Sequence, residues 1–170
     1  MNAYEVMKKI EERCHNLLDA LPTILANEAV LFAKENFEAE RWRGKSEEEW
    51  DKRKDSNNTK KLLVDSGDLS RSVSNPDIEI GKDKATITIG SNLPYAKAHN
   101  FGFEGEVNQN VREHERRAKN GKEYFVKAHK RIMKMRIPKR QFIGKWEDSP
   151  MFQERIKETL RKEINNIHKF

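Results

Sequence analysis

A periodic apolar stripe near the N-terminus constrains the fold more than any other feature of the sequence. Between residues 3 and 39, apolar side chains recur at steps of three and four residues, as they do on one face of a helix. They are Val6, Met7, Ile10, Cys14, Leu17, Leu18, Leu21, Leu25, Ala29, Phe32, Ala33 and Phe37. Because Pro22 lacks a backbone donor, we expect it to bend this helix or to divide it into two. A second stripe, over residues 150–170, predicts an amphipathic C-terminal helix.

Such stripes matter because apolar residues are scarce. Hydrophobic residues make up 35% of the 170 residues and charged residues 36%, whereas about 25% charged residues is usual. The length fits one domain, placed at residues 1–170. No apolar run approaches the roughly 18 residues that span a membrane, and Cys14 has no disulfide partner. The first residues also lack an apolar signal core, so we expect synthesis in a reducing cytoplasm and no membrane partner.

Two further stretches suggest local structure. Residues 77–90 alternate apolar and polar side chains on both sides of a turn at 81–84, which predicts a β-hairpin with one apolar face. Residues 38–61 form a long, charged loop in which Trp42 and Trp50 are expected to be anchors. Ser46 and Glu49 have the spacing of a capping box, which predicts a short helical turn around Trp50.

Positive charge is concentrated in one segment. The whole chain carries a net charge of +6. Residues 111–140 contain twelve basic and three acidic residues, a net charge of +9. Asn120-Gly121 is a strong signal for a two-residue hairpin turn, which would place Lys119 opposite Lys122 and Glu115 opposite Val126. We therefore predict a basic hairpin over residues 107–137, whose arms both carry the pattern Val-basic-x-His-x-Arg. A ribbon with so little apolar content requires a neighbour.

No catalytic, metal or cofactor motif stands out. The five histidines (His15, His99, His114, His129 and His168) lack the spacings of zinc sites. Ser66 is not in a nucleophile elbow, and the 8 glycines are scattered, without a phosphate loop. We therefore expect no enzyme, no metal and no cofactor. The basic segment is the one feature whose composition suggests binding to a partner. We expect it to contact DNA or a neighbouring subunit through Arg112, Arg116, Arg117, Lys127, Lys130 and Arg131.

Four short motifs follow one another in a recognisable order. The first is Leu62-Leu63-x-x-Ser66-Gly67-x-Leu69-x-x-Ser72-Val73, and the second is an alternating strand that ends in Ile89-Gly90-Ser91. The third is Pro94-Tyr95-Ala96-x-x-His99-Asn100-x-Gly102, and the last is Ile137-Pro138-x-Arg140-x-Phe142-Ile143-Gly144. With these residues the chain resembles the phage virion morphogenesis (tail completion) family of Mu-like tailed phages, over about residues 20–145. It is more loosely similar to head–tail joining and tail-terminator proteins. The segment between Gly102 and Ile137 is longer than the short loop expected at this place.

The resemblance implies an α+β fold. A small antiparallel sheet would be packed by the long N-terminal helix and the C-terminal helix, with the basic hairpin protruding. It also implies a structural protein of a phage or prophage, made in the bacterial cytoplasm and located in the virion neck. There it would form a ring, expected to be sixfold, between the tail tube and the head connector. The alternative is a nucleic-acid-binding module that uses residues 111–140.

The motif residues are interpreted as scaffold. They are Leu63, Ser66, Gly67, Leu69, Gly90, Tyr95, Ala96, His99, Gly102, Pro138, Arg140 and Phe142. We expect the three glycines to need a positive φ or a close backbone approach. Tyr95 and Phe142 should be packed, and His99 should form a local hydrogen bond.

Overall fold

The computed structural model describes residues 2–53, 59–167 and 169. It contains four α-helices, one short 3₁₀ helix and eight short strands among these residues. In chain order they are α1 Ala3–Ala39, β1 Arg41–Arg43, β2 Glu47–Glu49, α2 Asp68–Ser72, β3 Asp77–Ile80, β4 Ala85–Thr88, α3 Ala96–Phe101, β5 Phe103–Val111, β6 His114–Arg117, β7 Glu123–Val126, β8 His129–Ile137, η1 Trp146–Asp148 and α4 Pro150–Ile167. The predicted α+β class is confirmed, with a long N-terminal helix and a C-terminal helix.

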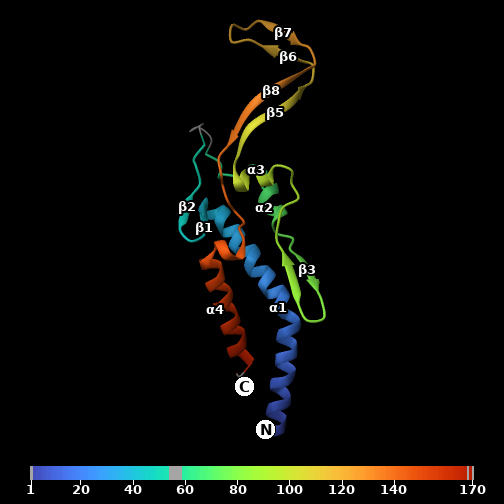
Figure 1. Ribbon diagram of the computed structural model, residues 1–170, viewed down its shortest axis with the longest axis vertical. Helices are drawn as coiled ribbons and strands as arrows, with labels where there is room; N and C mark the ends of the chain where they lie inside the picture. The colour runs from blue at the N-terminus through green and yellow to red at the C-terminus, as the bar shows by residue number, and fades with distance from the viewer. Residues whose placement is uncertain (1, 54–58, 168, 170) are drawn as a thin grey trace.

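The N-terminal stripe forms one helix, α1, with Pro22 inside it. Of the two expected effects of Pro22, division into two helices does not occur, and the helix axis changes direction along its length (Figure 1). A capping box starts the helix: Asn2 Oδ1 accepts from Glu5 N, and Glu5 Oε2 accepts from Asn2 N. The helix ends at Glu40, which adopts a left-handed conformation with φ of 51°. Proline removes one backbone hydrogen bond, and here the rest of the long helix tolerates that loss.

The core lies around the C-terminal half of α1. It consists of Ala33, Phe37, Trp50, Leu62, Leu69, Val73, Ala96 and Phe142. Phe37 is its centre: its ring meets that of Trp50 edge-on at 5.8 Å and that of Phe142 at 4.9 Å, measured between centroids. The core thus joins α1 to the loop after it, to α2 and α3, and to the segment that follows β8.

Both tryptophans of the 38–61 loop are buried, as expected of anchors. Trp50 Nε1 donates to Gln141 O at 2.9 Å, and Trp42 packs edge-on against Phe32. The helical turn predicted around Trp50 is wrong, because β1 and β2 form a hairpin there, with Arg41 opposite Glu49. Trp50 N donates to Glu40 O at 2.9 Å, which continues the hairpin pairing by one residue and leaves no helical turn at Trp50. Residues 54–58 of this predicted loop lie outside the described residues.

The strands do not form one sheet. They form four separate two-stranded antiparallel sheets: β1–β2, β3–β4, β5–β8 and β6–β7. The hairpin predicted over 77–90 is β3–β4, in which Ile78 faces Ile87 and Ile80 faces Ala85. Its strands contact α1, and Ile87 is half-buried.

The basic hairpin is longer than predicted. It begins at Phe103 instead of residue 107 and ends at Ile137, which faces Phe103 across β5–β8. Its distal part is the β6–β7 ribbon. Figure 1 shows β5 and β8 rising from the body and β6 and β7 turning sharply aside at their far end. We call residues 103–137 the arm. Its strands contact mainly one another.

The register at the tip of the arm differs from the prediction by one residue. Arg117 faces Glu123 and Glu115 faces Phe125, so Glu115 is not opposite Val126. Ala118 N donates to Lys122 O, and Gly121 adopts a φ of 85°. The turn therefore has three residues, 119–121, with glycine in the left-handed position, which is the second common way to close a hairpin.

Candidate assembly surfaces

Six of the predicted scaffold residues line one cavity. It has a volume of about 330 Å³ and lies beside α2 and α3. Its walls are Arg53, Leu62, Leu63, Asp65, Ser66, Asp68, Leu69, Tyr95, His99 and Arg140. The motifs that are separated in sequence therefore meet in space here. Ala96 and Phe142 lie in the core instead, and Gly90, Gly102 and Pro138 do not line this cavity.

His99 and Arg140 are joined by a backbone hydrogen bond. Arg140 N donates to His99 O at 2.8 Å, while Arg140 Nε and Nη2 both donate to Asp51 O. The expected local hydrogen bond of His99 is absent at one ring nitrogen: Nδ1 is buried and has no partner among the described residues. Burial lowers the pKa of His99, and the positive charge of Arg140 lowers it further. The imidazole is therefore held in its neutral form.

Asn100, which is not among the predicted scaffold residues, makes the central contacts of these motifs. Its Oδ1 accepts from Phe142 N at 2.9 Å and from Ile143 N at 3.0 Å, and its Nδ2 donates to Ile143 O at 3.0 Å. Asn36 of α1 donates to Phe142 O on the same segment. Two buried asparagines thus hold the chain after the arm against α1 and α3. The sequence feature that could have indicated this role is the His-Asn-x-Gly motif, in which the amide, not the imidazole, is the structural group.

Two of the three scaffold glycines behave as expected. Gly67 and Gly102 both have a φ of 78°, and a Cβ on Gly102 would lie 3.2 Å from Lys139 N. The expectation for Gly90 is wrong, because no atom lies within 4 Å of its Cβ position and its φ is not left-handed. Tyr95 is 41% exposed and therefore only partly packed, whereas Phe142 is fully buried.

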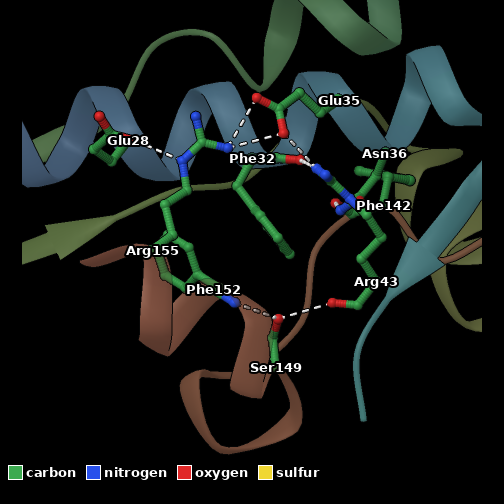
Figure 2. A network of polar contacts seen from close by, with 9 residues as sticks. All are labelled: Glu28, Phe32, Glu35, Asn36, Arg43, Phe142, Ser149, Phe152 and Arg155. Atoms are coloured by element: carbon green, nitrogen blue, oxygen red, sulfur yellow. Dashed lines mark hydrogen bonds and ion pairs between the residues drawn. The ribbon is translucent and has the colours of Figure 1, made fainter. Parts of the chain in front are cut away.

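A polar network joins α4 to α1 and β1 (Figure 2). Arg155 donates to Glu28 at 2.6 Å and to both carboxylate oxygens of Glu35 at 2.8 Å. Arg43 also donates to Glu35, at 2.7 Å. Burial alone would raise the pKa of Glu35, but the hydrogen bonds from Arg43 and Arg155 outweigh it and lower the pKa. Ser149 Oγ caps α4 at Phe152 N and donates to Arg43 O.

An apolar groove lies beside this network. Its volume is about 510 Å³, and α1, α4, β4 and the segment after the arm all contribute to it. Apolar side chains dominate its lining: Leu25, Ala29, Phe32, Ala33, Trp42, Ile87, Ile89, Phe142, Ile143, Trp146, Phe152 and Ile156. Trp146 and Met151 at this end of α4 remain 46% and 44% exposed. An apolar groove with an exposed tryptophan is typical of a surface that another protein covers.

The six predicted contact residues of the arm divide into two groups. Arg112, Arg116 and Arg131 line one hollow at the bend between β5–β8 and β6–β7. Arg117, Lys127 and Lys130 are exposed but do not line it. At the base of the arm, by contrast, Glu104 pairs with Arg136 and Glu106 faces Lys134. The excess positive charge therefore belongs to the distal part of the arm.

Among the described residues, no three His, Cys, Asp or Glu side chains are grouped so that they can hold a metal ion. Nor does any helix of that part of the chain have the length and apolar character needed to cross a membrane. His168 lies outside the described residues.

Comparison with known proteins identifies a family. The model of the phage virion morphogenesis family matches residues 6–165, which is nearly the whole chain and includes the arm. No curated protein and no solved structure matches the chain significantly.

Proposed function

The chain belongs to the phage virion morphogenesis family, and on this basis we propose that it is a structural protein of the head–tail neck. It completes or terminates the tail tube as one subunit of a ring, which we take to be a hexamer. Its partners are further copies of itself, the tail-tube protein and the head connector. It is encoded by a phage or a prophage and resides in the virion.

The arm is the observation that carries this proposal. Both of its two-stranded ribbons leave much of their surface to solvent, and an isolated ribbon is at best marginally stable in water. In a ring, each subunit contacts the next one head to tail, and the series of contacts closes. Every projection therefore has a neighbouring subunit beside it. The apolar groove between α1 and α4 offers a second surface of the right character for subunit contact.

We also propose that this role involves no catalysis. The polar motif residues are engaged in internal contacts: Asn100 holds the segment at Phe142, and Arg140 holds the loop at Asp51. These contacts suit a rigid subunit that functions through its surfaces and not through a pocket.

Removal of the gene from the phage that encodes this chain tests the proposal. We expect filled heads and separate tails to accumulate in electron micrographs, and a plasmid copy to restore joined, infectious particles. Light scattering of the purified chain should show a monomer or weak oligomer that becomes a ring with the tail-tube protein of the same phage. Normal infectious particles without the gene would refute the neck role, and a strict monomer with the tail tube would refute the ring.

A further inference from the structure

The bend of the arm is built from two copies of one short pattern. Val111 to Arg116 and Val126 to Arg131 both read Val-basic-x-His-x-Arg. The strand pairing is interrupted at the same positions of both copies. Val111 and His129 form the last pair of β5–β8, and His114 and Val126 form the first pair of β6–β7. In each copy the histidine Nδ1 lies within hydrogen-bond distance of the carbonyl two residues earlier, at 2.9 Å for Arg112 O and 2.8 Å for Lys127 O. The bend in Figure 1 is therefore a defined, internally symmetric joint.

The joint creates a hollow of about 420 Å³, which we call the notch. It is lined by Gln109, Asn110, Val111, Arg112, His114, Arg116, Val126, His129 and Arg131. Three arginines and two histidines therefore share one concave surface, and no carboxylate of the described residues lines it.

Strand register explains why the acidic residues are missing from the notch. Along β6–β7, the His114–Val126 and Arg116–Tyr124 pairs share one face of the ribbon. Glu115 pairs with Phe125 and Glu123 pairs with Arg117, so both glutamates lie on the opposite face. The register predicted from Asn120-Gly121 would have put Glu123 on the same face as His114 and Arg116. The observed one separates the charges.

The arginines of the notch remain available for a ligand. Within the described residues, neither Arg112 nor Arg116 forms an ion pair. Arg131 Nε donates to Gln109 Oε1 at 2.8 Å, which positions its side chain without neutralising it. A guanidinium group presents a planar fork of donors that matches phosphate oxygens and remains positively charged at any physiological pH.

From this geometry we propose that the notch binds the phosphate backbone of DNA without reading its sequence. A protein partner is the weaker choice, because the centres of protein interfaces combine arginine with aromatic residues and Met. The notch has arginines but no Phe, Tyr, Trp or Met, and two valines are its apolar contribution. The inference goes beyond the proposed neck role, because completing a tail tube does not itself require contact with DNA.

Fluorescence anisotropy with a labelled mixed-sequence duplex of about 24 base pairs tests the proposal, with the full chain at 50–200 mM NaCl. In the notch variant, Arg112, Arg116 and Arg131 are all replaced by Gln. In the control variant, Lys119, Lys122 and Lys134, which lie on the arm outside the notch, are replaced by Gln, so that net charge falls equally. We expect the notch variant to bind at least tenfold more weakly at 100 mM NaCl. The slope of log K against log [NaCl] should become shallower by an amount that corresponds to about two to three phosphate contacts. The control should lose less than threefold.

Equal losses in both variants would overturn the proposal, since net charge alone would then explain binding. Absence of binding by the unaltered chain would overturn it as well. A notch variant that binds DNA normally but no longer binds the tail-tube protein would assign the notch to a protein partner. A third variant with Arg→Lys at the same three positions keeps the charge, and we expect it to retain most of the affinity. None of these results bears on whether heads and tails join without the gene, so the neck role stands or falls separately.

Discussion

Glu35 is a charged residue through which α4 is held to α1 and β1. It accepts from both Arg43 and Arg155, and these contacts lower its pKa. A carboxylate with a lowered pKa in the folded state contributes stability above its ordinary pKa of 4.5, and this contribution is lost as the pH falls through the folded-state pKa. The network therefore stabilises the chain at neutral pH and fails in acid.

Replacing Glu35 by Gln tests this linkage. At pH 7 we expect a loss of about 1 kcal/mol of unfolding free energy, kept small because the side chain is 42% exposed. The loss should shrink as the pH falls below the ordinary pKa of 4.5, so that melting curves of the two chains converge once the pH is below the lowered pKa of Glu35. Glu158→Gln on the exposed face of α4 is the control and should leave stability unchanged within about 0.5 kcal/mol. A difference that is independent of pH would contradict the assignment.

Glycine positions give a second test at the residue scale. Gly102→Ala should destabilise the chain by about 1–3 kcal/mol, because its φ is 78° and a Cβ would press on the backbone at Lys139. Gly90→Ala is the matched control: its Cβ position is open, so we expect little change in the melting temperature. Equal melting temperatures for both variants would show that the left-handed conformation of Gly102 is not required.

The position of a single residue could be predicted only where one physical effect, such as the burial of a large apolar side chain, determines it. The burial of Trp42, Trp50 and Phe142 follows from their large apolar surface. The roles of His99 and Asn100 did not follow from their types, because both are polar residues in a short motif. Only the approach of residues 142–143 in space distinguishes the amide that holds the backbone from the imidazole that does not.

At the scale of elements, periodicity determined what was predictable. The stripes that form α1 and α4 and the alternation that forms β3–β4 involve many residues and were read correctly. The tip of the arm has no apolar face to fix its register, so a single turn signal decided it and misplaced it by one residue. The β1–β2 hairpin was missed because three consecutive glutamates give no strand signal.

Cysteine pairs can measure that register directly. Ala118 and Lys122 share a backbone hydrogen bond, so the next pair, Arg117 and Glu123, is of the closely spaced, non-hydrogen-bonded type. In a chain with Cys14→Ser, we expect Arg117→Cys with Glu123→Cys to form a disulfide readily under mild oxidation. Arg117→Cys with Tyr124→Cys, the pair that the two-residue turn would place together, is the control. Faster cross-linking of the control pair, measured by mass spectrometry, would restore the predicted register.

On the scale of the whole molecule, the family match covers residues 6–165 and confirms the resemblance that the motifs indicated. The α+β class follows from the helical stripes and the short hairpins together. The sequence did not indicate where the core and the arm lie relative to one another. The core gathers around Phe37 at one end of α1, whereas the arm extends away from it (Figure 1). Among the described residues, no buried side chain belongs to the arm, so the core of the body does not draw on it.

This division predicts that folding and function can be separated. Deleting residues 112–130 and joining Val111 to Arg131 by a short Gly-Ser link removes β6–β7 and the joint but keeps most of the β5–β8 pairing. Because the core cluster contains no residue of the deleted segment, we expect the melting temperature to change by only a few degrees. The same deletion should abolish infectious, tailed particles in a phage that lacks the intact gene, because the arm is the part that a neighbouring molecule must cover. If the shortened chain fails to fold, the distal arm supports the body, and the separation between a self-sufficient core and an interacting arm is wrong.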